Sequence, residues 1–249
     1  MGYWDIVNRV IDDADILLLL LDARLIDETR NKEIEQKVER QKKPLIFVIT
    51  KCDLVNKKTV ESYKKQIKNS VFVSARKHYG TTMLRDKILI EKRRSYKDLK
   101  SVKVGVLGYP NVGKSSLINT MKGKKSAPTS ILSGHTKAVQ KIKADNRITF
   151  LDTPGVIPYK ERDAEKHIAI GTIDFTKARE PDLAAMTMMT KYPGIIEKYY
   201  GVKINDDKEE TLIDIAKIRN ILIKGGKPDI KRVARMILKD WQKGEIKLS

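Results

Sequence analysis

The sequence has almost no cysteine, a shortage of acidic residues and no long apolar run. Cys52 is the single cysteine among 249 residues, which excludes an internal disulfide and a cysteine-rich zinc site. The longest apolar run, residues 16–21, is six residues long, whereas a membrane-spanning helix needs roughly 18 or more. The first residues also lack the basic and then apolar order of a secretory signal. We therefore expect a cytoplasmic protein with no membrane anchor.

Acidic residues number 32 against 51 Lys and Arg, which gives a formal net charge of +19. Residues 56–125 hold 19 basic and 4 acidic residues, and residues 217–243 hold 9 and 2. Solvated helix faces explain a single basic run, but two separate clusters are typical of a protein that binds phosphates. No stretch pairs a basic face with Trp, Phe and Leu as an interfacial helix does. RNA or a ribonucleoprotein is therefore favoured over a membrane as the partner.

Short apolar runs alternate with helix-periodic stretches in the first 150 residues. The runs predict strands at 16–21, 45–49, 71–73, 102–107 and 148–151, with helices at 3–13, 29–42, 57–69, 80–94 and 113–122. This alternation is typical of an α/β fold with a mostly parallel sheet buried on both faces. From about residue 160 the pattern is helical, and the last helix is expected at 229–243. The sequence predicts an α/β domain at 1–158 and a small all-helical domain at 159–249.

A phosphate-binding motif lies between a predicted strand and a predicted helix. Residues 108–115, Gly-Tyr-Pro-Asn-Val-Gly-Lys-Ser, fit G-x-x-x-x-G-K-[ST] in the context that the motif requires. Its backbone N–H groups would turn toward the phosphates, Lys114 would reach the β- and γ-phosphates, and Ser115 would ligate Mg²⁺. The nucleotide-binding residues predicted here are Asn111, Val112, Gly113, Lys114, Ser115 and Ser116.

A second phosphate element, Asp152-Thr-Pro-Gly155, follows the predicted strand at 148–151 and fits D-x-x-G. A carboxylate at the end of a buried strand can hold Mg²⁺ through water, and the Gly155 N–H can meet the γ-phosphate. Thr136, in the intervening loop, is predicted as the second hydroxyl ligand of Mg²⁺. The predicted metal ligands are therefore Ser115, Thr136 and Asp152, and the residues assigned to catalysis are Asn111, Lys114, Thr136, Asp152 and Gly155.

Two further strand ends carry residues suited to guanine. Thr50-Lys51-Cys52-Asp53 resembles [NT]-K-x-D, in which the aspartate accepts guanine N1–H and the N2 amino group, an arrangement that adenine cannot satisfy. Ser74-Ala75 resembles the S-A element, whose backbone N–H approaches guanine O6. Because ligands bind at strand ends in open α/β sheets, the two elements together predict GTP and GDP as the ligands.

The order of these elements is circularly permuted, because the guanine elements precede the phosphate loop. This order, with Asp13 to Ile16, Leu21 to Arg24, Thr29 to Asn31 and the stretch 232–244, resembles the circularly permuted GTPases of the YlqF/YawG family over essentially the whole chain. The resemblance implies a permuted Ras-like P-loop domain and GTP hydrolysis coupled to maturation of the large ribosomal subunit. It also implies that C-terminal helices contact rRNA. A monomer is the default expectation.

The residue after D-x-x-G is Val156, which cannot orient water as the glutamine of Ras-type enzymes does. Three substitutes stay open: His135, a monovalent cation near Asn111, or a group from the partner. Because Asn111 is similar to the asparagine of potassium-activated GTPases, K⁺ is expected to accelerate turnover. Two alternatives to an assembly switch also stay open. One is an RNA-binding module with structural GTP and negligible turnover, and the other is a GTPase of another RNA process, such as tRNA modification.

Overall fold

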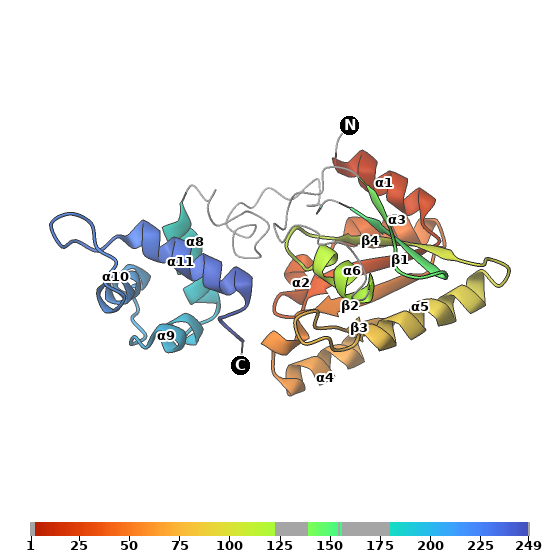
Figure 1. The fold of residues 1–249 in the computed structure, drawn as a ribbon. Helices are drawn as coiled ribbons and strands as arrows, with labels where there is room; N and C mark the ends of the chain where they lie inside the picture. Colours follow the sequence, from red (N-terminus) through yellow and green to blue (C-terminus); the bar gives the residue numbers. More distant parts are fainter. Residues whose placement is uncertain (1–2, 123–138, 154, 156–179, 249) are drawn as a thin grey trace. The chain divides into compact units, whose positions relative to one another are not determined.

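The chain divides into two compact units, Met1–Glu161 and Arg162–Ser249, which are described separately (Figure 1). The computed structural model describes residues 3–122, 139–153, 155 and 180–248. The predicted domain boundary at 158/159 lies outside these residues, so it stays a prediction.

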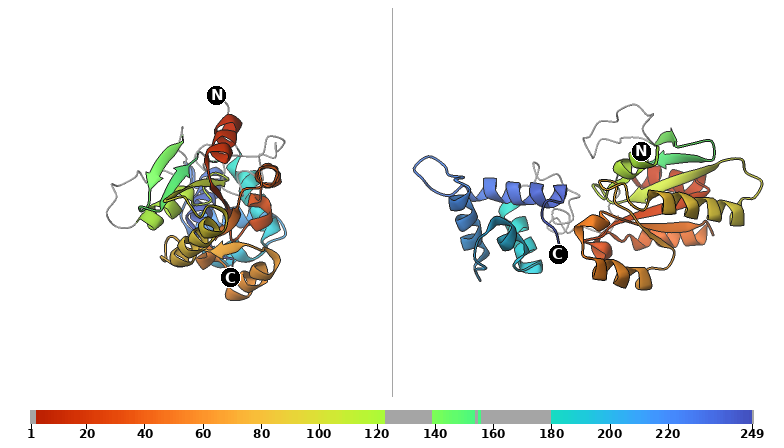
Figure 2. Two further views of the ribbon diagram at one scale, coloured as in Figure 1. Left: turned by 90° about the vertical axis from the view of Figure 1, so that its right-hand side faces the viewer. Right: turned by 60° about the horizontal axis from the view of Figure 1, so that its bottom comes forward.

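The first unit is built on one six-stranded sheet with the order β3-β2-β1-β4-β6-β5 (Figures 1 and 2). All neighbours are parallel except β5 and β6. The strands are β1 (Ile16–Asp22), β2 (Leu45–Thr50), β3 (Ser70–Phe72), β4 (Val102–Gly108), β5 (Gln140–Lys143) and β6 (Ile148–Asp152). The five predicted strands are confirmed, with small shifts at their ends.

Alternation along β1 places apolar side chains on both faces of the sheet. On one face Leu17, Leu19 and Leu21 join a core with residues of α1 (Tyr3–Asp13) and α3 (Lys32–Arg40). The chain also forms α4 (Lys57–Gln66), α5 (Thr81–Ser95) and α6 (Lys114–Lys122). Helix α6 contacts β4, β6 and α5, and α5 contacts β1. All seven residues of β1 are buried, which explains its uninterrupted run of Ile and Leu.

Parallel pairing determines where the candidate site lies, because the carboxyl ends of parallel strands meet at the same edge of a sheet. The register pairs Asp22 with Thr50, Leu20 with Gly108, and Val106 with Asp152. The carboxyl ends of β1, β2, β4 and β6 therefore lie side by side, and a polar segment follows each of them.

Two elements differ from the sequence prediction. Strand β5 was not predicted, because three of its four residues are exposed and its sequence Gln-Lys-Ile-Lys lacks an apolar run. The single helix predicted at 29–42 is instead α2 (Ile26–Thr29) followed by α3. The break has a local cause: Asn31 is the N-cap of α3, and its Oδ1 accepts the Ile34 N–H at 3.1 Å.

The described part of the second unit consists of four helices: α8 (Pro181–Lys191), α9 (Ile195–Tyr200), α10 (Lys208–Ile218) and α11 (Ile230–Lys243). Helix α11 packs against α8 and α10. Its apolar side, Val233, Ile237 and Trp241, is buried, as the sequence predicts. Trp241 stacks on Tyr192 with ring centroids 5.3 Å apart. Met188 and Met189 of α8 are also fully buried, so these methionines belong to a helical core.

Candidate GTP-binding site

The phosphate loop connects β4 to α6 and coils around the lysine of its own motif. Lys114 is 7% exposed, and its Nζ donates to Gly108 O at 3.0 Å and to Tyr109 O at 2.6 Å. A Cβ on Gly108 would lie 2.8 Å from Leu20 O, so only glycine fits between this loop and β1. Lys114 is thereby held at the start of a helix, where backbone N–H groups collect and favour phosphate.

Lys114, Ser115 and Asp152 form the polar corner of the loop. Burial lowers the pKa of Lys114 to about 8, and the charge of Asp152 opposes that shift. Burial raises the pKa of Asp152, while Lys114 and Ser115 oppose it. Ser115 Oγ lies 3.4 Å from Asp152 Oδ2, and Asp152 Oδ1 is a buried oxygen with no hydrogen-bond partner among the described residues. A hydroxyl beside an unsatisfied carboxylate oxygen is an oxygen-only donor set of the kind that Mg²⁺ prefers.

Gly155 lies directly against the phosphate loop. A Cβ added to it would lie 2.4 Å from Pro110 N and 2.5 Å from Pro110 Cα, which no side chain can tolerate without a backbone shift. The D-x-x-G segment is anchored just before this point, where Thr153 is buried and its Oγ1 donates to Val106 O at 2.7 Å. A displacement of the phosphate loop and a displacement of Gly155 are therefore mechanically linked.

The predicted guanine elements follow β2 and β3. Lys51 adopts a left-handed conformation (φ +55°), and Cys52–Leu54 form one 3₁₀ turn that leaves Asp53 half-buried. Burial, with a contribution from Asp53, raises the pKa of Cys52 to about 11, so this thiol is not a nucleophile at neutral pH.

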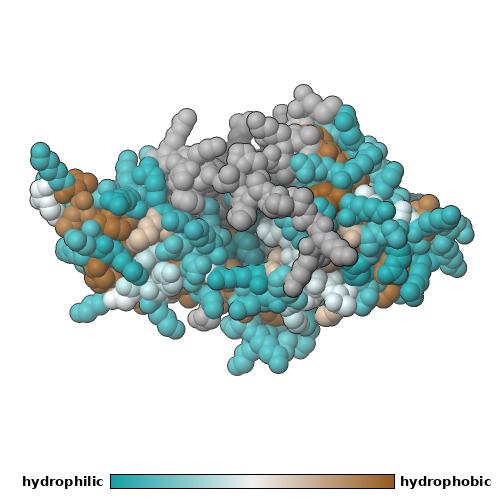
Figure 3. All heavy atoms as spheres, in the orientation of Figure 1, coloured by the Kyte–Doolittle hydropathy of each residue, from teal (hydrophilic) through white to brown (hydrophobic). Residues whose placement is uncertain are grey.

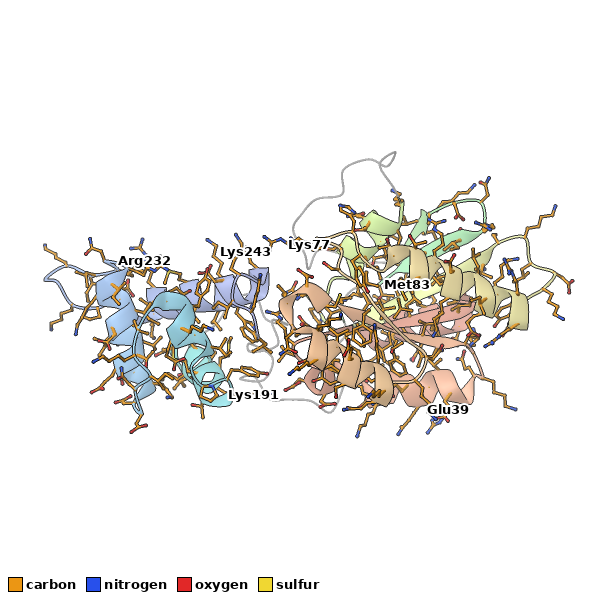
Figure 4. All side chains as sticks on the ribbon, turned by 90° about the horizontal axis from the view of Figure 1, so that it is seen from below. Glu39, Lys77, Met83, Lys191, Arg232 and Lys243 are labelled. Carbon is orange, nitrogen blue, oxygen red and sulfur yellow. The ribbon has the colours of Figure 1, made fainter. Side chains whose placement is uncertain are left out.

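The S-A element lies beside this turn. The Cys52 N–H donates to Val73 O at 3.4 Å, which joins the turn to the end of the β3 segment. Ser74 is buried, and its Oγ accepts the N–H of Lys77, which is labelled in Figure 4, at 3.1 Å. The half-buried Ala75 follows Ser74. The two guanine elements are thereby brought together.

Thr50 joins the guanine elements to the phosphate loop. Its buried Oγ1 lies 2.9 Å from Leu21 O and 2.6 Å from Val112 O. Val112 is buried, Asn111 is half-buried with φ +59°, and Gly113 has φ +103°. Ser116 lies exposed in the first turn of α6. The two predicted half-sites, 62 residues apart along the chain, therefore share one hydroxyl.

Asp22 and Arg24 belong to this site, although sequence reasoning gave them no role. Asp22 Oδ2 accepts Lys51 Nζ at 2.8 Å and Arg24 Nη2 at 2.8 Å, and its Oδ1 accepts Arg24 Nε at 3.0 Å. Burial alone would raise the pKa of Asp22, but Lys51 and Arg24 outweigh it and hold the pKa well below its ordinary range. Burial lowers the pKa of Lys51, and Asp22 opposes that shift. Asp22 could have been found from the sequence as a carboxylate at the carboxyl end of a strand that is buried along its whole length.

Several predicted residues lie outside the described part of the chain. These are Thr136, His135 and Val156, so the second hydroxyl ligand and the groups around the attacking water stay predictions. Among the described residues, no group of three or more His, Cys, Asp and Glu side chains could hold a metal ion. Within the same residues, no helix combines the length and the apolar character needed to cross a bilayer.

Comparison with known proteins identifies the family of the chain. The model of a family described as 50S ribosome-binding GTPase matches residues 103–234. The chain is 40% identical over 248 residues to an uncharacterized GTP-binding protein of Methanocaldococcus jannaschii, with 97% of this chain and 65% of that protein covered. It is 31% identical to nucleolar GTP-binding protein 2 of Saccharomyces cerevisiae, with 98% and 52% covered. The chain thus spans about half to two thirds of the length of these relatives.

Solved structures match over nearly the whole chain. The crystal structure of GNP-bound YlqF from T. maritima matches with a TM-score of 0.66 at 24% identity, covering 97% of this chain and 93% of that one. A GDP-bound YlqF structure matches with a TM-score of 0.68 at 23% identity, covering 97% and 95%. The predicted fold class, a circularly permuted P-loop GTPase domain with a helical C-terminal part, is confirmed.

Proposed function

Because the chain belongs to the family of 50S ribosome-binding GTPases, we propose that it hydrolyses GTP to GDP and phosphate as a switch in large ribosomal subunit assembly. The observation that carries the proposal is the junction at Thr50. One buried hydroxyl lies within hydrogen-bond distance of the carbonyl that precedes Gly113 and of the carbonyl that precedes Asp22. Occupancy of the phosphate loop is therefore coupled mechanically to the guanine side, as a nucleotide switch requires.

Mg²⁺ fits the corner formed by Ser115 and Asp152. Ser115 Oγ and Asp152 would hold the ion, the latter directly or through water, and Thr136 is proposed as a further hydroxyl ligand. When bound, Mg²⁺ neutralises charge that develops on the β- and γ-phosphate oxygens. Lys114 contributes its charge to the same oxygens after its ammonium leaves the Gly108 and Tyr109 carbonyls.

Guanine selection is assigned to Asp53, with Lys51 alongside the base. Asp22 restrains the ammonium of Lys51, which keeps the aliphatic stem of that side chain in one orientation. The far side of this corner is assigned to the S-A element: the Ser74 N–H donates to Tyr79 O at 3.0 Å, so the Ala75 N–H is proposed to approach guanine O6. We propose that GTP binds far more tightly than ATP for this reason.

Water activation is proposed to depend on what binds the protein. The aliphatic side chain of Val156 can neither donate nor accept a proton, so GTP turnover by the protein alone should be slow. We propose that K⁺ near Asn111 and a group on the ribosomal partner supply the missing charge. Asn111 adopts a left-handed backbone conformation, with φ +59°, in the phosphate loop.

The partner is proposed to be rRNA within the large ribosomal subunit. The net charge of +19 and its concentration in residues 56–125 and 217–243 support a phosphate-rich surface as the partner. Membrane association is not part of the proposal, and the protein is taken to act in the cytoplasm as a monomer.

Steady-state phosphate release tests the proposal directly. GTP and ATP should be compared in K⁺ and Na⁺ buffers, with and without purified large ribosomal subunits. We expect turnover of GTP alone, an increase in K⁺, and a further increase with subunits. Tight GTP binding without stimulation by subunits would contradict the assembly role, and it would favour a structural nucleotide or another RNA partner.

A further inference from the structure

A hairpin connects α10 to α11 in the second unit. We name it the 218–228 hairpin. Its strands are joined by a bridge between Leu222 and Pro228, and the Ile223 N–H donates to Lys227 O at 2.9 Å. Its base is fixed as well, because the Ile221 N–H donates to Ala216 O at 2.8 Å. The hairpin is therefore an ordered element with a defined shape (Figure 1).

The hairpin exposes large apolar side chains. Ile218 is 59% exposed, Ile223 is 50% exposed and Leu222 is 37% exposed. In Figure 3 the hydrophobic colour gathers at the end of the second unit where this hairpin lies. Leu222 and Ile223 are neighbours on the hairpin, and Ile218 is the last residue of α10, at which the hairpin begins. Exposed aliphatic side chains grouped in this way point to an interaction surface.

Basic residues flank these apolar side chains along the chain. Residues 217–232 include six basic residues, Lys217, Arg219, Lys224, Lys227, Lys231 and Arg232, and one acidic residue, Asp229. Asp229 is occupied as the N-cap of α11, where its Oδ1 accepts the Arg232 N–H at 3.1 Å. Arg232 itself is exposed in the first turn of that helix (Figure 4). Two of these six are engaged outside the hairpin, because Lys217 Nζ lies 3.9 Å from Asp214 Oδ1 and Arg219 lies over the Tyr200 ring. Lys224 and Lys227 on the hairpin, with Lys231 and Arg232 at the start of α11, carry the remaining positive charge.

The tip is bare backbone. Gly225 and Gly226 have φ values of +90° and +75°, and a Cβ on either residue would meet nothing within 4 Å. A tip without side chains can approach a flat surface closely, while Lys224 and Lys227 flank it on both sides. This combination suits a groove whose walls carry negative charge.

We propose that the 218–228 hairpin is an RNA-binding element that lies on the wide, shallow minor groove of an RNA helix. Lys224 and Lys227 contact phosphates on the two sides of the groove, while Leu222 and Ile223 pack on riboses and base edges. The A-form minor groove is accessible and presents such surfaces, and aliphatic side chains are used as wedges in nucleic-acid grooves. An acidic protein fits less well, because it would leave the glycine tip without a function. This inference rests on the proposed RNA partner and locates its contact.

The test measures binding of the full chain to labelled, protein-free large-subunit rRNA across a salt series. In Lys224→Gln/Lys227→Gln, loss of two phosphate contacts should lower the slope of log affinity against log salt by about 1.4 to 1.8 and weaken binding about 25- to 60-fold near 0.1 M salt. In Leu222→Ser/Ile223→Ser, affinity should fall about tenfold, as expected for roughly 60 Å² of lost apolar contact. The salt slope of this second variant should not change.

Lys198→Gln/Lys203→Gln is the matched control, because both lysines are exposed on the second unit and lie outside residues 56–125 and 217–243. Its rRNA affinity and salt slope should not change. Thermal unfolding should be unchanged in all three variants. Unchanged rRNA affinity in both hairpin variants would overturn the inference. The same result together with lost binding to intact subunits would identify a protein partner instead. If the unaltered chain does not bind rRNA, the proposed partner itself is wrong, whereas GTP turnover without RNA reports on the GTPase independently.

Discussion

Replacing Asp22 by Asn tests the electrostatic centre of the site with almost no change in shape. The carboxylate is 2% exposed and accepts four hydrogen bonds of 2.8 to 3.0 Å, three from the side chains of Lys51 and Arg24 and one from the Arg24 backbone N–H. Asp22→Asn leaves two cations facing a neutral amide. Loss of one partner of a buried ion pair costs about 3–5 kcal/mol. We take the lower end, about 3 kcal/mol, because Lys51 is 24% exposed and its share of the attraction is screened by solvent.

This cost should appear as a fall in the unfolding midpoint of roughly 6–12 °C, at about 2–4 °C per kcal/mol for a domain of this size. It should also depend on pH. The folded state lowers the pKa of Asp22, so its stabilisation is complete above the ordinary carboxyl value near 4 and is lost as the pH falls below it. The Asn variant should lack this acid-dependent part of the unfolding free energy.

Urea unfolding of a double-mutant cycle separates this role from general damage. In a Lys51→Met background, Asp22→Asn should cost at least about 1 kcal/mol less, because one of its two cations is already gone. The control is Asp145→Asn, which breaks the partly exposed ion pair with Arg85 and should cost about 1 kcal/mol or less. A loss below about 1 kcal/mol for Asp22→Asn, or equal costs in both backgrounds, would refute the reasoning.

Three further predictions concern the nucleotide. Asp53→Asn should move the nucleotide preference from GTP toward XTP, because an amide N–H can donate to the carbonyl that xanthine carries at C2. Competition binding with the two nucleotides measures this preference, and an unchanged preference would exclude Asp53 from base recognition. Gly155→Ala should lower GTP turnover at least about tenfold, since its Cβ would lie 2.4 Å from Pro110 N and a backbone shift at a reacting site carries a cost of that order. Gly201→Ala is the control for backbone strain alone, because its φ is +73° but its Cβ would meet nothing within 4 Å; it should leave turnover unchanged. With the pKa of Lys114 lowered to about 8, GTP affinity should fall as the pH rises above that value. The nucleotide-free protein should become more stable relative to Lys114→Met over the same interval, because the unfolded state then binds the extra proton; a flat titration of both quantities would contradict the burial argument.

The sequence predicted best what depends on local pattern. Strand β1 was predictable because its run of six apolar residues is short enough for a strand buried on both faces and too short for a buried helix. The phosphate loop was predictable because its glycines and Lys114 have a fixed spacing. Strand β5 was missed because an edge strand with exposed lysines has no apolar signal. Its existence depends on pairing with β6, which only the folded sheet supplies.

The sequence predicted which residues the structure brings to one edge of the sheet, but not the hydrogen bonds between them. The motifs named Thr50 and Lys51 as nucleotide contacts, yet their hydrogen bonds to Val112 O and Asp22 depend on the parallel register of β1, β2 and β4. Asp22 carries no motif that assigns it a role, since an aspartate after a strand is common at turns. Long-range pairing of this kind has no signal in residue spacing, so only the structure shows that the two half-sites are tied together.

The pairing of β1 with both β2 and β4 has a consequence for synthesis. Chains emerge from the ribosome N-terminus first, so β1, β2 and β3 can pair while residues 102–108 are still within the translating ribosome. During that interval one edge of β1, the most apolar strand of the sheet, has no partner and is open to aggregation. Arrival of β4 covers this edge and delivers the phosphate loop in the same event. The nascent chain thus gains the β1–β4 pair and the phosphate loop together, before β6 adds Asp152. Nucleotide binding during translation would therefore report that β4 has joined β1.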